Sequence, residues 1–190
     1  LTYVYSSAYP NNPASMFGHT LVRVSKSRDL KKSDPLLDYG VNFAAQIPNG
    51  EVGYKYVTFG LLGLYPGSIE IAPYYNKVLE YNSAESRDLW EYDLAFTPEE
   101  SRFWVKHVWE LRWLAIFRYT FLTKNCSYQI IRSFQVVRPE LKDLLPPNPL
   151  FILPGDTVRQ IAVEHPGLIR GVHFRPSHFR VLADRYDQLN

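Results

Sequence analysis

Cys126 is the only cysteine in the chain and the side chain best suited to covalent chemistry. It stands in "LTKNCSYQII", where a turn gives way to apolar residues at helical spacing, with Ile130, Ile131 and Phe134 following it. A thiol at a helix N-terminus has its thiolate stabilised by the helix dipole and by unpaired backbone N–H groups. The alternative is that Cys126 is an ordinary buried residue on the apolar face of the helix.

A nucleophilic cysteine needs a base within hydrogen-bond reach, usually a histidine, and a third polar group that orients the ring. Of the five histidines, His19 is the best candidate because it follows Gly18 at the start of the β-branched stretch "HTLVRV". His107 lies in an aromatic-rich helical stretch, and His165 precedes a proline in a turn. The alternative for His19 is that it only caps the strand.

The third polar group is expected on a neighbouring strand. "HTLVRVSK" and "DPLLDYGVNFAA", separated by the polar "SRDLKKSD", predict an antiparallel hairpin. If the hairpin turns midway, His19 lies opposite Asn42, and Asp38, Gly40 and Asn42 share one face. Asn42 could then accept the imidazole N–H through its side-chain oxygen. Asp38, displaced by about two cross-strand pairs on this register, is the alternative orienting residue.

Metal and cofactor sites have weak support in the sequence. His173 and His178 flank "FRPS", but two histidines without a nearby cluster of acidic or cysteine residues are weak evidence for a metal site. The glycines at 60, 63 and 67 lack the strand, turn and helix context of a phosphate cradle. We therefore predict no metal and no cofactor.

The composition indicates one folded domain that does not bind nucleic acid. The 190 residues are 46% hydrophobic, 21% charged and 15% aromatic, which is typical of a globular protein. The net charge of +2 is spread along the chain. The one basic cluster, expected at a solvated hairpin tip, comprises Lys26, Arg28, Lys31 and Lys32.

The remaining patterns predict both strands and helices. A short strand opens the chain, followed by a loop from about residue 6 to residue 17. "EVGYKYVTFGLLGLYPGSIEIAPY" is interpreted as strand and loop, "YYNKVLEYNS" as a short helix, and "RDLWEYDLAF" as a strand. In this last strand, one face is expected to comprise Trp90, Tyr92 and Leu94.

The clearest helix start is in "TPEESRFWVKHVWELRWLAIF", with Thr97 as N-cap, Pro98 in the first turn and Glu100 three residues after the cap. The apolar face of this helix is expected to comprise Phe103, Val108, Leu111 and Ala115.

The proline-rich stretch 146–154 is the one plausible domain boundary. We expect residues 1–145 to form the main domain and residues 146–190 to form an extension that packs on it. This extension is expected to contain a short helix over 157–163, an extended piece and a C-terminal tail. The fold class predicted for the whole chain is α+β, with an antiparallel sheet packed against helices.

Four stretches together resemble a known family: "SAYPNNPASMFGHTLVRV", "LLDYGVNFAA", "RDLWEYDLAFTPEESRFWVKHVWEL" and "YTFLTKNCSYQIIRSF". The family is the N-terminal periplasmic domain of Lnb, a bacterial lipoprotein N-acyltransferase, long catalogued as a domain of unknown function. The resemblance covers residues 3–134. Its most specific pieces are the Ser-x-x-Gly-His of Ser15, Gly18 and His19 and the Asn-Cys pair of Asn125 and Cys126.

That family is similar to the circularly permuted papain-like group, which includes NlpC-type peptidases and relatives of lecithin:retinol acyltransferase. In such domains the histidine strand precedes the cysteine helix, which is the order found here. The resemblance implies Cys126 as nucleophile, His19 as base and a following polar residue, Asn42 or Asp38, as the orienting group. It also implies a periplasmic or cell-envelope location. One departure is Lys124, where relatives often carry an acidic residue before the Asn-Cys pair.

The expected function is cysteine-dependent acyl transfer at an amide or ester, either like a lipoprotein N-acyltransferase or like a thiol hydrolase or peptidase. The backbone N–H of Cys126 is expected to help hold the oxyanion, assisted by Asn125 or Ser127. The alternative is a non-catalytic envelope domain that binds a lipid or a peptide. The residues expected to contact substrate are Ser15, Tyr39, Tyr119 and Asn125, with Phe17 and Phe121 as further candidates for an apolar groove.

The expected partners follow from the same interpretation. They are an acyl lipid, a lipoprotein or a peptide as substrate, with no nucleic acid. Association with a membrane surface and a place in a larger multidomain protein are further expectations. No signal sequence follows Leu1, so the chain is expected to be a processed segment.

Overall fold

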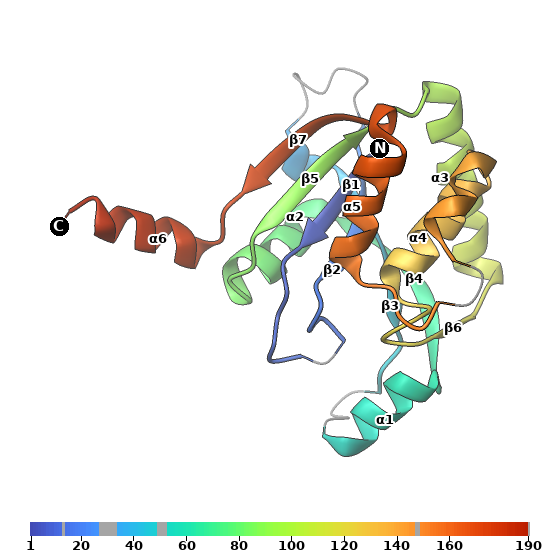
Figure 1. The fold of residues 1–190 in the computed structure, drawn as a ribbon, viewed down its shortest axis with the longest axis horizontal. Coiled ribbons are helices and arrows are strands. Elements are labelled where there is room, and N and C mark those ends of the chain that lie inside the picture. The colour runs from blue at the N-terminus through green and yellow to red at the C-terminus, as the bar shows by residue number, and fades with distance from the viewer. Residues whose placement is uncertain (13, 27–33, 49–52, 147–148, 190) are drawn as a thin grey trace.

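Seven antiparallel strands form one sheet in the order β6-β4-β3-β2-β1-β5-β7 (Figure 1). This computed structural model describes residues 1–12, 14–26, 34–48, 53–146 and 149–189. The predicted α+β class with an antiparallel sheet is confirmed. The strands are β1 (Thr2–Ser6), β2 (His19–Val24), β3 (Tyr39–Ala45), β4 (Tyr65–Pro73), β5 (Leu89–Leu94), β6 (Phe117–Tyr119) and β7 (Ile169–Arg175).

Helices cover both faces of the sheet. They are α1 (Tyr54–Leu62), α2 (Tyr74–Val78), α3 (Pro98–Leu114), α4 (Cys126–Gln135), α5 (Pro154–Glu164) and α6 (His178–Asp187), with a π-helical turn over Leu79–Ala84 and 3₁₀ turns over Pro35–Leu37, Pro139–Leu144 and Pro166–Leu168. Alternation along β2 separates the two faces. Val22 packs with Trp104 of α3 and Ile130 of α4 in the larger core cluster, whereas Leu21 packs with Tyr74 of α2 and Tyr81 in a smaller one.

The predicted hairpin is present as β2 and β3, but its register differs from the expected one. Asn42 lies opposite Leu21 rather than opposite His19. His19 and Asn42 therefore become diagonal neighbours on the same sheet face, still within reach of long side chains. Residues 27–33, which hold most of the basic cluster predicted at the hairpin tip, lie outside the described part of the chain.

The interpretation of residues 54–62 as strand and loop was wrong, because they form α1. The helix ends at Gly63, which is left-handed at φ 69° and serves as the C-cap. Gly60 lies against the ring of Phe121, so close that a Cβ there would be 2.2 Å from it, and its carbonyl accepts the Phe121 N–H at 3.0 Å. Tertiary contacts of this kind override the β-propensity of an aromatic-rich stretch.

The predicted N-terminus of α3 is confirmed as a complete capping box. Thr97 accepts the Glu100 N–H through its hydroxyl, and the Glu100 carboxylate accepts the Thr97 N–H. Phe103, however, was wrongly placed on the buried face, since it is 54% exposed while its neighbour Trp104 is fully buried. The apolar stripe of α3 is therefore centred one residue later than its aromatic content indicates, with Val108 also buried.

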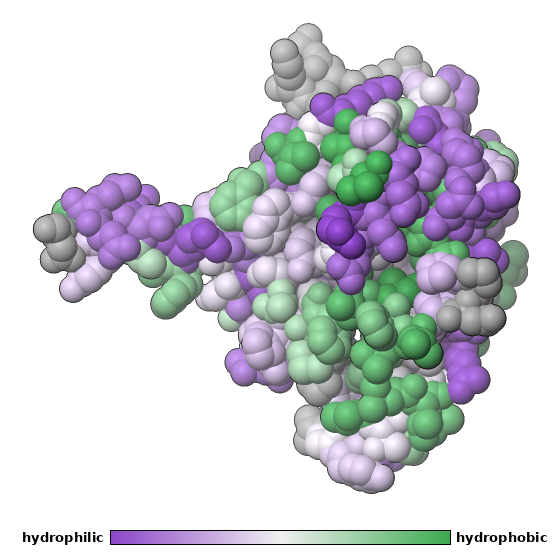
Figure 2. Space-filling model, viewed as in Figure 1, coloured by the Kyte–Doolittle hydropathy of each residue, from purple (hydrophilic) through white to green (hydrophobic). Residues whose placement is uncertain are grey.

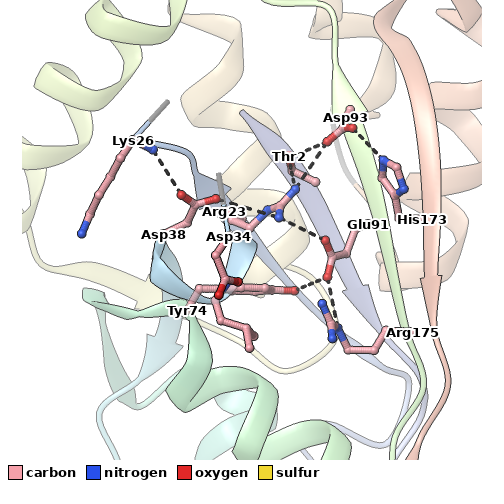
Figure 3. A network of polar contacts seen from close by, with 11 residues as sticks. Thr2, Arg23, Lys26, Asp34, Asp38, Tyr74, Glu91, Asp93, His173 and Arg175 are labelled. Atoms are coloured by element: carbon pink, nitrogen blue, oxygen red, sulfur yellow. Dashed lines mark hydrogen bonds and ion pairs between the residues drawn. The ribbon is translucent and has the colours of Figure 1, made fainter. Parts of the chain in front are cut away.

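A cluster of buried charges lies on the α2 face of the sheet (Figure 3). The Arg23 guanidinium is 3.4 Å from Glu91, 3.6 Å from Asp93 and 3.9 Å from Asp38, and it donates to Thr2 Oγ1 at 3.0 Å. The predicted strand over residues 89–94 is confirmed as β5. Its acidic residues occupy the face opposite to the predicted apolar one. The Arg23 guanidinium is therefore shared by two carboxylates of β5 and one of a loop, with Arg175 also 3.5 Å from Glu91.

The C-terminal residues join the same sheet and core. Val158 and Ile161 of α5 belong to the larger core cluster, and β7 pairs with β5 at the sheet edge. The helix predicted over 157–163 is confirmed within α5. Helix α6 has no buried residue and extends away from the sheet (Figure 1). In the described part of the chain, no helix combines the length and the apolar character needed to cross a membrane.

Candidate active site

Helix α4 begins at Cys126, as the sequence predicts. Asn125 is its N-cap, and the Asn125 side-chain oxygen accepts the Tyr128 N–H at 3.3 Å. The Asn125 amide donates to the carbonyls of Phe121 at 3.2 Å and Ile152 at 2.7 Å. All polar atoms of this buried side chain are thus engaged inside the protein. Asn125 positions the cysteine turn, and the geometry does not support its predicted contact with substrate.

A glycine and a turn position His19 at the start of β2. Gly18 has φ 97°, and a Cβ there would lie 2.6 Å from the Tyr5 ring, so only glycine fits without strain. The Ser15 carbonyl accepts the N–H groups of Gly18 and Tyr9, both at 3.0 Å. Ser15 therefore shapes the loop that delivers His19, and it does so through its backbone.

The structure brings the three predicted catalytic side chains together. His19 lies close enough to the Cys126 thiol for each group to shift the pKa of the other, and His19 Nε2 lies 2.6 Å from Asn42 Oδ1. Because an amide oxygen only accepts, Nε2 carries the proton toward Asn42, which leaves Nδ1 for the thiol. Cys126 is 2% exposed and His19 is 7% exposed. The hydrogen bond to Asn42 fixes the orientation of the His19 ring, and both side chains lie in a site almost closed to solvent.

A further chain of polar contacts holds Asn42. Its amide donates to Glu70 Oε2 at 3.3 Å, and Glu70 pairs with Lys77 Nζ at 3.2 Å. Asp38, the alternative orienting residue, is not part of this chain. Its carboxylate accepts the Lys26 N–H and faces Arg23 in the buried charge cluster. Of the two candidates, Asn42 is the one in contact with His19.

The electrostatics of the pair favour a thiolate. Burial raises the pKa of the Cys126 thiol, but the imidazole charge and hydrogen bonds from His19 and Thr20 outweigh it and lower the pKa to about 6. Burial lowers the pKa of His19, yet the interactions with Cys126 and Asn42 raise it above its ordinary value. These opposite shifts describe a thiolate-imidazolium pair in which each ion stabilises the other.

Thr20, which sequence reasoning missed, and Ser127, which it named as a possible aid to the oxyanion, flank the pair. Thr20 helps to lower the pKa of the Cys126 thiol, and its hydroxyl lies 2.9 Å from that of Ser127. Each follows a predicted catalytic residue directly. That adjacency is the only available signal, since a lone hydroxyl next to a strand or helix start has no distinctive spacing.

The Cys126 N–H was predicted to hold the oxyanion, but in the structure Tyr119 occupies it. The backbone N–H of Cys126 donates to the Tyr119 hydroxyl oxygen at 3.1 Å and is therefore already engaged. Burial, together with the Cys126 charge, raises the pKa of Tyr119 well above its ordinary value, so the phenol keeps its proton. Tyr119 was predicted to contact substrate, and the structure places its hydroxyl directly beside the nucleophile.

The other predicted lining residues are dispersed. Phe121 packs with Tyr56, at 5.2 Å between ring centroids, in a small aromatic cluster that also holds Tyr119. Tyr39 pairs with Val24 at the other end of the hairpin, roughly 16 Å along β2 from His19 at 3.3 Å per residue. Tyr39 therefore does not belong to the Cys126 site.

The two C-terminal histidines, His173 and His178, lie in different surroundings. His173 Nε2 lies 3.0 Å from Asp93 Oδ2, beside the buried charge cluster. His178 is the first residue of α6. Within the described ranges, no group of three or more His, Cys, Asp or Glu side chains is placed to hold a metal ion.

Comparison with known families gives one match for this chain. Residues 1–164 match the family described as the Lnb N-terminal periplasmic domain. The chain belongs to this family. The match confirms the resemblance indicated by the Gly-His and Asn-Cys motifs and extends it from residue 134 to Glu164, the last residue of α5. No curated protein and no solved structure matches the chain.

Membership in the family also confirms the predicted periplasmic location. The matched region contains Cys126, His19 and Asn42 together with every element that positions them. Strand β7 and helix α6 lie beyond it. The candidate site therefore lies within the matched region, and the C-terminal strand and helix lie outside that region.

Proposed function

We propose that this domain is a cysteine-dependent acyl-transfer enzyme, with Cys126 as nucleophile, His19 as base and Asn42 as the residue that orients His19. The observation that carries the proposal is the buried Cys126–His19–Asn42 arrangement with its lowered thiol pKa. A structural cysteine in an apolar interior would have a raised pKa. Perturbed groups with specific charge partners cluster at functional sites.

The proposed reaction requires only Cys126 and His19 to form and break bonds and to move protons. The Cys126 thiolate attacks a substrate carbonyl, forming a bond from Sγ to carbon, and His19 gives its proton to the departing amine or alcohol as the old bond breaks. An amine or water then loses a proton to His19 and attacks the thioester. The bond from Sγ to carbon breaks, and the thiolate is restored. An amine acceptor makes the enzyme a transacylase, and water makes it a hydrolase or peptidase.

Tyr119 supplies a second role in this scheme. Its hydroxyl oxygen accepts from the Cys126 N–H, and we expect its own proton to donate to an oxyanion formed next to Sγ. We expect Tyr119→Phe to reduce the rate of acylation by about a hundredfold, the loss typical of one oxyanion donor. Alkylation by iodoacetamide forms no oxyanion and should change little. Equal losses in both reactions would show that Tyr119 only supports the local structure.

The order of elements supports a circularly permuted papain-like relationship. In that group the histidine strand precedes the cysteine helix, and here β2 with His19 precedes α4 with Cys126. The oriented imidazole, hydrogen-bonded to an amide on the neighbouring strand, fits the same scheme. We propose this relationship on the arrangement of the site and on the element order.

An acyl lipid or lipid-modified peptide is the substrate class that the surroundings favour. Figure 2 shows apolar side chains gathered over α1 and the loops between it and α4. Backbone hydrogen bonds from Phe121 to Gly60 at 3.0 Å and from Ile152 to Leu122 at 2.6 Å join this surface to the turn before Cys126. Its exposed apolar residues include Leu61, Leu62, Leu64, Leu150 and Phe151. Contact with a membrane surface through these residues is part of the proposal.

A second candidate is a non-catalytic domain that holds a lipid or peptide. The observation in its favour is that the site is closed to solvent: Cys126 and His19 are both buried, and the Cys126 N–H is occupied. Such a domain would still bind acyl compounds but would form no covalent intermediate.

Incubation with p-nitrophenyl octanoate separates the two candidates. The enzyme is expected to gain one octanoyl group on Cys126, seen by mass spectrometry and removed by hydroxylamine, as a thioester should be. The rate should rise as the pH passes about 6, because the thiolate forms there, and fall again where His19 loses its proton. Cys126→Ala is the control. Ester cleavage that is equal in this variant, or no adduct at all, would refute the enzyme hypothesis.

A further inference from the structure

A cavity lies between helix α3 and the sheet, apart from the Cys126 site. It has a volume of about 510 Å³, which is within the range of small-molecule sites. Val41, Trp104 and Val108 form its buried floor, and Trp109 and Trp113 form an exposed rim. We call this cavity the tryptophan groove. The rest of its lining comprises Val24, Tyr39, Ile71, Val105 and Arg112.

The tryptophan groove is distinct from the cysteine site. Val24 and Tyr39 pair at the end of the hairpin farthest from His19, about 16 Å along β2. The groove also opens on the α3 face of the sheet, whereas His19 shares the α2 face with Leu21. A compound bound here would not reach the thiol.

The charges around the groove have one sign. Among the described residues that line the groove, Arg112 is the one with a charged side chain, and its guanidinium stacks over Trp113 at 5.4 Å. Lys26 Nζ lies 4.6 Å above the ring of Tyr39 at the same rim. Glu70, whose pKa the Arg112 charge helps to lower, is already paired with Lys77. No ion pair joins Arg112 to another of the described residues, and a guanidinium beside an apolar cavity is suited to a carboxylate or phosphate.

We propose that the tryptophan groove binds a single-chain anionic amphiphile, with its alkyl chain against the tryptophans and valines and its carboxylate or phosphate head on Arg112. The apolar floor stabilises the chain by removing it from water. The volume suits one chain, whereas a stable protein partner would require an interface of about 800 Å² on each side. This site is independent of the proposed acyl transfer at Cys126.

Intrinsic fluorescence offers a direct test, because three of the four tryptophans line the groove and the fourth, Trp90, lies on β5. Dodecanoate, dodecyl phosphate and dodecyltrimethylammonium would be titrated below their micelle concentrations. We expect saturable binding of one anion per chain, about tenfold tighter than the cation, as one charge-assisted hydrogen bond would give. A preference between the two anions would identify the head group.

Variants connect the binding to named residues. Arg112→Gln should weaken anion binding about tenfold and remove the discrimination against the cation. Arg102→Gln is the matched control on the same helix, since Arg102 is exposed and paired with Glu99. Cys126→Ala should bind normally, which keeps this result separate from the fate of the enzyme hypothesis. Equal affinity for anion and cation, no effect of Arg112→Gln, or binding only to phosphatidylglycerol vesicles would overturn the proposal.

Discussion

Replacing His19 by alanine is expected to slow acylation of Cys126 by about a thousandfold or more near neutral pH. The variant loses the base that removes the thiol proton and the cation that stabilises the thiolate. Burial raises the pKa of Cys126, and the variant lacks the histidine that mainly opposes this effect. The measurement is the rate of p-nitrophenol release with excess ester, together with the mass of the acyl-enzyme.

Two comparisons make this result specific. His178→Ala, which removes an exposed histidine from α6, should leave the rate unchanged. Asn42→Ala should give an intermediate loss, because it leaves the base in place but frees its orientation. If His19→Ala kept more than about a tenth of the parent rate, His19 would not be the general base, whose contribution is typically a hundredfold or more.

Arg23→Met is expected to have the largest effect on stability, lowering the free energy of unfolding by about 3–5 kcal/mol. The guanidinium is buried among Asp38, Glu91 and Asp93, and its removal leaves these buried carboxylates without their shared cation (Figure 3). Methionine keeps much of the volume, so the loss reports on charge. Urea unfolding followed by circular dichroism measures it.

The matched controls use a second arginine and a second carboxylate. Arg102→Met removes a surface ion pair with Glu99 and should cost less than about 1 kcal/mol. Adding Asp38→Asn to Arg23→Met should recover part of the loss, because the buried carboxylate that paired with Arg23 is removed as well. A cost below about 1 kcal/mol for Arg23→Met would show that water reaches these carboxylates and that the cluster is not a stabilising core.

Local signals in the sequence predicted the elements that carry the site. The capping pattern at Thr97, the apolar spacing after Cys126 and the β-branched stretch after His19 each depend on neighbouring residues, and each is confirmed. The same applies to the Asn-Cys and Gly-His motifs, through which family membership could be anticipated.

Features that depend on distant contacts could not be predicted. The helix over residues 54–62 is held by Phe121, more than fifty residues away. The register of β2 and β3 depends on a hairpin tip whose turn the sequence does not specify. The engagement of the Cys126 N–H by Tyr119 requires β6 to pair with β4, which no local pattern indicates. In each case a partner remote in sequence determines the outcome.

The site residues divide along the same line. Cys126, His19 and Asn42 have side chains whose chemistry restricts their roles, and the structure brings them into contact. Asn125 and Tyr39 were chosen for their position near motifs. One became a helix cap, and the other lines a separate cavity. Sequence position near a motif is therefore weaker evidence than side-chain chemistry combined with a strand or helix start.

The most direct test of the central claim is a pH titration of the thiolate by its ultraviolet absorbance, in the parent protein and in His19→Ala. Cys126 is the only cysteine, so subtracting the Cys126→Ala spectrum isolates its signal. The account predicts a midpoint of about 6 in the parent and a midpoint above the free-thiol value of about 8.5 in His19→Ala. A parent midpoint at or above that value, or one that does not move when His19 is removed, would contradict the thiolate-imidazolium pair.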